Sequence, residues 1–246
     1  MNLEREQQVA AGSQPAIETP DVPSREETQA NPALLLAWIE SRIHSIYSVT
    51  KDLEPDSQSI TISTSAYAKL YSAVVNYCIV TKAGPHRGNL KQGDLYLSME
   101  REIRAYCSGI RYAIFTDKTQ DLDIDAAERL LQTYVVQWDR FVKLARLVKN
   151  LLRFLERHWI KREIMEKKKD RYMIEDLHKR VWKEETLQIK KDGPSSRELQ
   201  ALTDAAVMLR EKAGGITVGK TDLVQSVVNA LSSIDLSVDV YLDATQ

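Results

Sequence analysis

The stretch 214–221 is the part of this chain whose spacing best fits a chemical task. Its letters match a phosphate-binding loop at Gly214, Gly219, Lys220 and Thr221. In such a loop the backbone amides surround the phosphates, the lysine reaches the terminal phosphates and the threonine hydroxyl holds magnesium. The loop also follows a buried strand, whereas residues 199–209 have the apolar spacing of a helix. We therefore favour a turn between two helices, with Thr221 capping the second, over a nucleotide-binding protein that uses 214–221.

The histidines and cysteines do not form a second candidate for chemistry. His158 and His178 are separated by a turn, and Glu175 with His178 is a single pair three residues apart. Cys78 and Cys107 lie inside apolar helical patterns, which indicates buried thiols in a reducing compartment rather than a disulfide or metal ligands. No serine, threonine or cysteine has the setting of an activated nucleophile. We expect no enzymatic activity, no cofactor and no metal.

The composition argues against several classes of partner. The chain has 246 residues, 43% of them apolar, and its formal net charge of -1 gives no global attraction to nucleic acid. The segment 157–183 holds ten lysines and arginines against five interleaved acids, which favours a solvated helix end over a nucleic-acid contact. No apolar run approaches the length of a membrane span, and the N-terminus lacks a signal pattern. We expect a cytoplasmic and/or nuclear protein that binds neither membranes nor nucleic acid.

Helical apolar spacing dominates the chain from residue 31 onward. Residues 1–30 carry three prolines and almost no large apolar side chains, which predicts a disordered N-terminal tail. The spacing then predicts helices over 31–47, 63–81, 95–116, 134–164, 172–189, 198–212 and 221–232. Only 236–242 alternates like a strand, and a lone strand has no sheet to join. The predicted class is therefore all-α, with one helical domain over 31–242 and a short C-terminal end, 243–246.

Two of these helices carry more apolar surface than burial on one side requires. Asp123 or Asp125 can cap the helical segment that leads into 134–164. The first apolar stripe on 134–164 is Tyr134, Trp138, Phe141, Ala145, Val148, Leu152, Leu155 and Trp159. Its second stripe is Leu144, Leu147, Leu151 and Phe154. On 63–81 the stripes are Leu70, Val74 and Tyr77, then Tyr67, Tyr71, Val75 and Cys78. Two stripes need cover on two sides, and spacing alone leaves open whether the second cover is the bundle or a partner.

Several segments resemble, in order and spacing, the first helical repeat of the cullin family, especially its cullin-1 branch. They are Tyr67-x-x-x-Tyr71-x-x-x-Val75-Asn76-Tyr77-Cys78, Gln137-Trp138, the run from Phe154 to Glu163, Trp182, and 197–231. The resemblance covers about 31–242. It implies an elongated, truncated bundle of the cullin-repeat type, and it makes 214–221 a turn between helices.

The resemblance also implies a function. A cullin is the non-catalytic scaffold of a cullin-RING (SCF-type) E3 ubiquitin ligase, which acts in ubiquitin-dependent protein catabolism. Its N-terminal repeat binds a Skp-type adaptor that carries an F-box protein, and its distant C-terminal region binds a RING protein and accepts a ubiquitin-like modifier. The adaptor-binding positions of the family fall here on Tyr67, Ala68, Tyr71, Val75, Phe154 and Arg157.

This chain departs from the family pattern in three respects. Ala68 and Val75 are smaller than the residues often found at those positions, which implies a shallower contact. The stretch 176–179 is more polar than in the family. The chain ends after one repeat, so we expect a fragment or a truncated competitor of the full scaffold, with a RING protein as partner only in a longer form. The alternatives are a nucleotide-binding protein that uses 214–221 and a helical tether without a ligase role.

Overall fold

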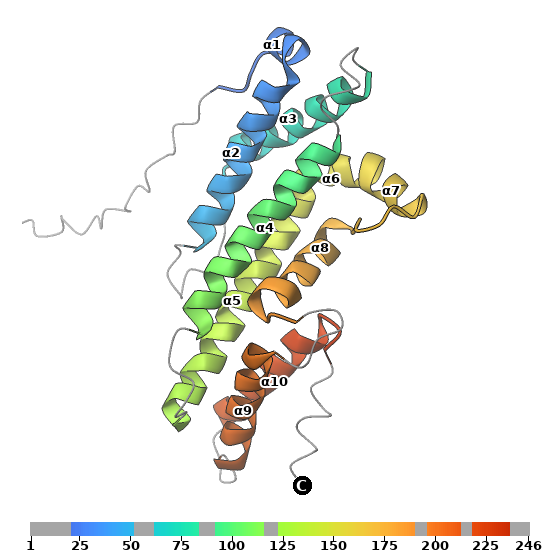
Figure 1. The fold of residues 1–246 in the computed structure, drawn as a ribbon. Helices are drawn as coiled ribbons and strands as arrows, with labels where there is room; N and C mark the ends of the chain where they lie inside the picture. The colour runs from blue at the N-terminus through green and yellow to red at the C-terminus, as the bar shows by residue number, and fades with distance from the viewer. Residues whose placement is uncertain are drawn as a thin grey trace, which may run out of the picture.

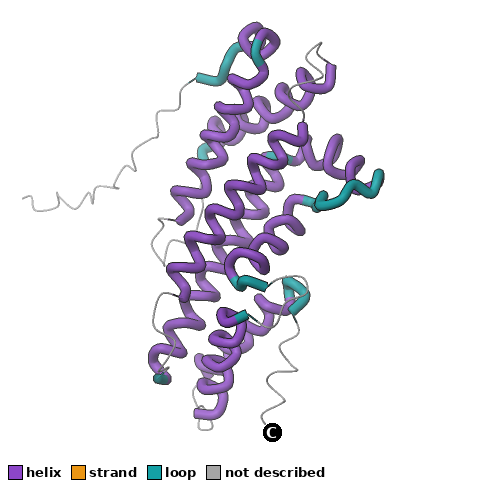
Figure 2. Tube along the Cα trace, viewed as in Figure 1, coloured by secondary structure: helices purple, strands orange, loops and turns teal. Residues whose placement is uncertain are grey.

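Helices form all the regular structure in the residues that the computed structural model describes, which are 21–51, 62–83, 92–115, 123–189, 196–212 and 218–236. Figure 2 shows these residues as helices and short loops. This confirms the predicted all-α class. In chain order the elements are α1 (Arg25–Ala30), α2 (Pro32–Lys51), α3 (Thr64–Ala83), α4 (Gln92–Phe115), α5 (Ile124–Leu151), α6 (Arg153–Leu155), the π-helical turn η1 (Glu156–Ile160), α7 (Lys161–Met165), α8 (Ile174–Val181), the π-helical turn η2 (Trp182–Thr186), α9 (Arg197–Lys212) and α10 (Val218–Ser232).

The longest helix, α5, is the axis of an elongated bundle. Figure 1 shows α2, α4 and α5 running side by side along the molecule, and α5 also packs against α3, α8, α9 and α10. The first apolar stripe predicted for this part of the chain, from Tyr134 to Trp159, is buried at every position. The helix therefore has the core face that the sequence predicts.

Aromatic side chains fill the middle of this core. The Trp182 ring lies 4.7 Å from the ring of Phe141 and 5.2 Å from that of Trp138, measured between centroids. The indole N–H of Trp182 donates a hydrogen bond to the Tyr134 hydroxyl at 3.4 Å. Tilted and edge-on pairs of this kind add to the stabilisation from apolar burial. The cluster joins α5 to η2, two segments that are about forty residues apart in the chain.

The long helix predicted over 134–164 is interrupted, which corrects the sequence expectation. Asp123 caps α5, because its carboxylate accepts the Ala126 N–H at 2.7 Å, and the helix breaks at Leu152, where φ is -97° and ψ is 15°. The chain then continues as α6, η1 and α7 to Met165. A π-helical turn holds more residues than an α-helical one and so rotates the side chains that follow. Within η1, Trp159 and Ile160 are both buried.

The helical bundle begins earlier than the sequence predicts, because part of the predicted tail, 1–30, is helical. Ser24 and Glu27 form a capping box: the Glu27 N–H donates to the Ser24 hydroxyl at 3.2 Å, and the Ser24 N–H donates to the Glu27 carboxylate at 2.8 Å. This box starts α1, which packs against α2 and α3. Residues 25–30 therefore belong to the bundle, while 1–20 lie outside the described residues.

Two helices near the C-terminus begin or end at other residues than the sequence predicts. The helix predicted over 172–189 begins at Ile174 and ends in the turn η2 at Thr186. The helix predicted from Thr221 begins three residues earlier, at Val218, so Thr221 lies within it and is not its cap. The strand-like stretch after Leu236 and the end 243–246 fall outside the described part of the chain.

Candidate functional site

The structure brings together the two segments that carry the predicted site residues. Four of these residues lie on α3, and the other two lie on α6 and η1. α3 packs against α6, so the two segments form one continuous part of the surface. We call it the α3–α6 surface, defined by Tyr67, Ala68, Tyr71, Val75, Phe154 and Arg157.

On α3 the two predicted stripes have different roles. Leu70, Val74 and Tyr77 are buried in the core. On the other stripe Tyr67, Tyr71 and Val75 are half-buried, and Ala68 beside them is exposed. The Tyr67 and Tyr71 rings are almost parallel, with centroids 6.4 Å apart and an angle of 5° between their planes. Each ring restricts the other, so the pair presents a fixed aromatic face.

At the end of the second α3 stripe the bundle itself provides the cover. Cys78 is buried, whereas Ile79 is 51% exposed. Near Cys78 the start of α4 covers the helix, since the Gln92 side-chain amide donates to the Cys78 carbonyl at 2.8 Å. Ile79 therefore extends the accessible side chains of Tyr71 and Val75 by one more helical turn. The sequence shows this as a step of four residues, from Tyr71 to Val75 to Ile79.

The second stripe of the long helix belongs mostly to the core. Leu144 and Leu151 are buried and Leu147 is half-buried. Only its last member, Phe154, adds a half-buried aromatic ring to the α3–α6 surface, and Arg157 is exposed one turn later. The stripe was predicted as a single flank, but α5 is long enough to be covered by different neighbours along its length.

Sequence reasoning missed His158 as part of this surface. Its exposed imidazole lies 4.3 Å from the Phe154 ring, measured between centroids, with the planes tilted by 39°. The two residues are four apart, which places them on one helical face and was visible in the sequence. Together with the exposed Arg153 and Arg157, and with Lys161 at the start of α7, this makes the α6–η1 half of the surface basic as well as aromatic.

An aromatic and basic surface of this kind is suited to docking a partner. Tyrosine and arginine are enriched among the residues that dominate protein–protein binding energy, and half-buried rings need little ordering on binding. Within the described ranges no three histidine, cysteine or acidic side chains are grouped as metal ligands. Nor is any helix of those ranges long and apolar enough to cross a membrane.

The stretch that matches a phosphate-binding loop follows a helix. α9 precedes it, and Val218, Gly219 and Lys220 form the first turn of α10, while 213–217 lie outside the described residues. A phosphate-binding loop is aimed by the strand before it, and here a helix occupies that place. The described structure agrees with a connection between two helices.

The polar stretch 176–179 is packed in an unexpected way, because His178 is fully buried. Its Nδ1 lies 2.6 Å from the Ile174 carbonyl oxygen, and its Nε2 lies 2.8 Å from the Tyr47 hydroxyl. Burial lowers the pKa of His178 to about 4, so the ring is neutral at pH 7. The spacing of Ile174, Leu177 and Val181 places His178 on the buried face of α8, and this spacing is readable in the sequence.

Both cysteines are buried, as predicted. Burial raises the pKa of the Cys78 thiol to about 12 and raises that of Cys107 further above its ordinary value. A thiol that stays protonated at neutral pH is a poor nucleophile and a poor metal ligand. Cys78 and Cys107 therefore contribute to packing.

Comparison with known proteins agrees with this architecture. The family model of the cullin alpha solenoid domain matches residues 38–245. Cullin-1 of Dictyostelium discoideum is 26% identical over an alignment of 180 residues that covers 68% of this chain and 21% of that protein. Cullin-6 of Caenorhabditis elegans is 26% identical over an alignment of 178 residues that covers 71% of this chain and 22% of the relative. Cullin-1 of the same nematode is 25% identical over an alignment of 135 residues that covers 48% of this chain and 16% of the relative.

The chain thus spans about a fifth of the length of these curated relatives. The family match covers most of its residues and includes every helix from α3 to α10. It also includes both halves of the α3–α6 surface. On this match and on the all-α architecture, the chain belongs to the cullin family.

Proposed function

We propose that this chain is a scaffold module of a cullin-RING E3 ubiquitin ligase and that its α3–α6 surface binds a Skp-type adaptor carrying an F-box protein. The module would act in ubiquitin-dependent protein catabolism, in the cytoplasm and/or the nucleus. One observation supports this assignment above the others. After the core is filled, Tyr67, Tyr71 and Phe154 remain half-exposed on two packed segments, next to the exposed Arg157.

The shape of the surface supports a protein partner. Ala68 follows Tyr67 and precedes Tyr71 by three residues on α3, so its small side chain leaves room beside the stacked rings. A partner side chain seated there would contact aromatic groups that are already held in place, which reduces the entropy lost on binding. Arg157 can then donate hydrogen bonds to a carboxylate or carbonyl at the rim.

The proposed role requires no reaction by the chain itself. A scaffold holds its partners in place, and the aromatic and arginine side chains of the α3–α6 surface fit contact rather than catalysis. A polypeptide of these 246 residues would bind the adaptor through the same surface as a longer cullin. It would therefore compete with the longer protein for the adaptor.

Calorimetric titration with a purified Skp-type adaptor bound to an F-box segment tests the proposal. We expect saturable binding by the chain and at least a tenfold loss of affinity for Tyr71→Ala combined with Phe154→Ala, because two anchors would be removed. Tyr112→Ala is the matched control, since Tyr112 is 65% exposed on α4, outside this surface, and its loss should change the affinity by less than about twofold.

Circular dichroism and thermal unfolding of each variant would establish that the fold is intact. Failure of the unmodified chain to bind the adaptor would contradict the proposal. The same conclusion would follow if the folded double variant bound as tightly as the unmodified chain.

A further inference from the structure

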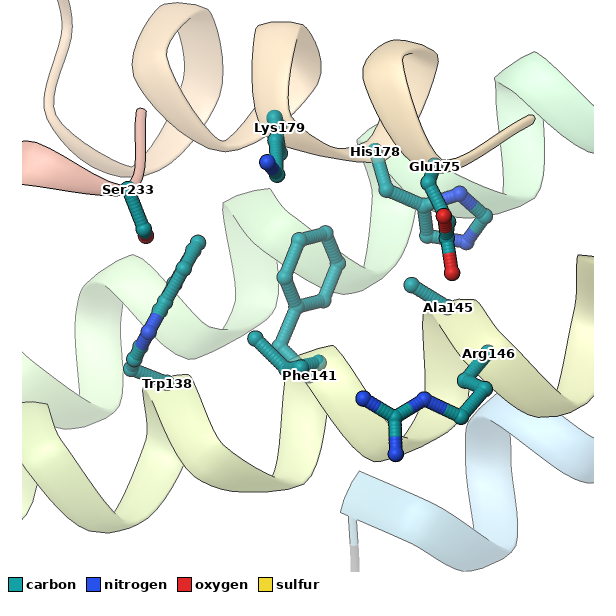
Figure 3. A pocket seen from close by; sticks show the side chains of 9 residues that line it. Trp138, Phe141, Ala145, Arg146, Glu175, His178, Lys179 and Ser233 are labelled. Carbon is teal, nitrogen blue, oxygen red and sulfur yellow. The ribbon is translucent and has the colours of Figure 1, made fainter. Parts of the chain in front are cut away.

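A pocket of about 320 Å³ lies between α5, α8 and the turn after α10. Figure 3 shows Trp138, Phe141 and Arg146 entering it from α5, and His178 and Lys179 entering it from α8. No residue of α3 or α6 lines it, so it is separate from the α3–α6 surface. Its volume is at the lower end of the range for small-molecule sites, about 300–1,000 Å³.

The floor of the pocket is aromatic and rigid. Trp138 and Phe141 are only 6% and 1% exposed, and both pack against Trp182 in the core cluster. Rings fixed in this way offer apolar contact area without further ordering when a ligand binds. Val142 and Ala145 add aliphatic surface beside them.

His178 contributes a wall and no charge. Both of its ring nitrogens already have hydrogen-bond partners, the Ile174 carbonyl and the Tyr47 hydroxyl. The ring is held neutral at pH 7 by its burial. A ligand in the pocket would therefore find no free hydrogen-bond donor or acceptor on the imidazole.

The rim of the pocket has an excess of positive charge. In Figure 3 Lys179 and Arg146 lie on opposite sides of the Phe141 ring, one from each helix. Both side chains are exposed, and neither has an ion-pair or hydrogen-bond partner within the described residues. The one acid that lines the pocket, Glu175, forms an ion pair with Lys149, with 2.7 Å between the Glu175 Oε2 and the Lys149 Nζ. Two unpaired cations therefore face the opening of an apolar pocket.

We propose that this pocket binds a small amphipathic anion, with an aromatic or short aliphatic body over Trp138 and Phe141 and a carboxylate that reaches Arg146 and Lys179. The apolar floor selects against simple inorganic ions, because burial of the ligand body supplies much of the binding free energy. The two cations select for a negative head group over a neutral one, because both can donate charge-assisted hydrogen bonds to a carboxylate. Because Arg146 and Lys179 are long and exposed, they can reach the carboxylate of a ligand with either an aromatic or an aliphatic body.

Calorimetric titration of the full chain with 4-phenylbutyrate and with octanoate tests the proposal. We expect saturable binding of at least one carboxylate, and at least tenfold weaker binding of the matched alcohols, 4-phenylbutanol and octanol. Inorganic phosphate should also bind at least tenfold more weakly than the carboxylate. Backbone amide shifts in α5 and α8, measured by nuclear magnetic resonance, would locate the bound carboxylate.

A charge-reversed double variant separates this pocket from general attraction to a basic protein. Arg146→Glu with Lys179→Glu should weaken carboxylate binding at least tenfold. Lys168→Glu with Lys169→Glu makes the same change in net charge at exposed positions that do not line the pocket, and should weaken binding less than twofold. All four side chains are exposed, so both variants should fold.

Four results would overturn the proposal. They are no saturable carboxylate binding at millimolar concentration, equal affinity for alcohol and carboxylate, equal affinity for phosphate, and equal loss of affinity in the two double variants. None of them bears on adaptor binding, which uses other residues.

Discussion

The buried contact between His178 and Tyr47 fixes the protonation of both side chains. A backbone carbonyl can only accept, so the His178 Nδ1 carries the hydrogen that is donated to the Ile174 oxygen. In a neutral imidazole Nε2 is then an acceptor, and the Tyr47 hydroxyl donates to it at 2.8 Å. The contact ties α8 to α2 through two satisfied polar groups. Burial of the ring also makes protonation of His178 unfavourable in the folded chain.

This contact predicts a loss of stability in mild acid. The pKa of His178 is about 4 in the folded chain, against an ordinary value of 6.5 that applies when it is unfolded. Between these values the unfolded chain binds a proton that the folded chain does not. The contribution of the neutral His178 ring to the free energy of unfolding is therefore complete above pH 6.5. It declines by up to about 3 kcal/mol as the pH falls toward 4. Urea unfolding at a series of pH values measures it.

Substitution separates this effect from the titration of carboxylates. His178→Leu should remove most of the decline between pH 6.5 and 4, whatever its effect on stability at pH 7. His158→Leu should keep the decline, because His158 is exposed. An identical dependence on pH in the two variants would show that His178 is not its source.

Among the helices, the interrupted end of the long helix has the clearest structural consequence. The π-helical turn η1 places the Glu156 side chain inside the protein, where only 5% of the residue is exposed. Its carboxylate accepts the Ile174 N–H at 3.0 Å, at the first residue of α8. An acid at a helix N-terminus satisfies a free donor and interacts favourably with the helix dipole. One element thereby caps another that lies close in space.

Glu156→Ala should destabilise the protein by about 2 kcal/mol, because the buried Ile174 N–H would lose its partner. The free energy of unfolding, measured with urea at pH 7, reports the change. Hydrogen exchange should be faster at the start of α8 than in the unmodified chain. The control Glu166→Ala removes an exposed acid ten residues later and should change the stability by less than about 0.5 kcal/mol. Equal effects of the two substitutions would refute the capping role.

For the whole molecule, stability depends on one continuous aromatic and aliphatic core. The ring of Phe141 lies 6.0 Å from that of Tyr106 on α4, and Tyr106 lies 5.6 Å from Tyr47 on α2, between centroids. Trp182 completes the chain of contacts from η2. Because four elements meet in this cluster, loss of one ring affects the packing of all of them.

Trp182→Ala should lower the free energy of unfolding by about 3–5 kcal/mol, which is the usual cost of removing a large buried aromatic side chain. Tyr112→Ala removes an aromatic side chain that is 65% exposed and should cost less than about 0.5 kcal/mol. Urea unfolding followed by circular dichroism compares the two. A similar loss in both variants would contradict the central position of Trp182. So would a Trp182 variant as stable as the unmodified chain.

Much of the fold could be predicted because helical periodicity is local. The stripe from Tyr134 to Trp159 is buried at all of its positions, and the stripe of Leu70, Val74 and Tyr77 on α3 is buried as well. The capping box at Ser24 and Glu27 is an equally local signal, and it starts a helix inside the stretch that the prolines predict to be a disordered tail. The break at Leu152 could not be read from periodicity, since it shifts the helix register without disturbing the apolar pattern on either side.

The sequence by itself determined the all-α class, the core faces and, through its resemblance, the family. It also supplied the side chains of the candidate surface, because residue type and spacing along a helix are local properties. Only the tertiary structure decided which surplus apolar residues stay accessible. Cys78 and Leu151 are covered, whereas Tyr67, Tyr71, Ile79 and Phe154 keep accessible area, because exposure depends on which helices pack nearby. The same packing buried His178 against Tyr47, a contact between residues that lie far apart in the sequence.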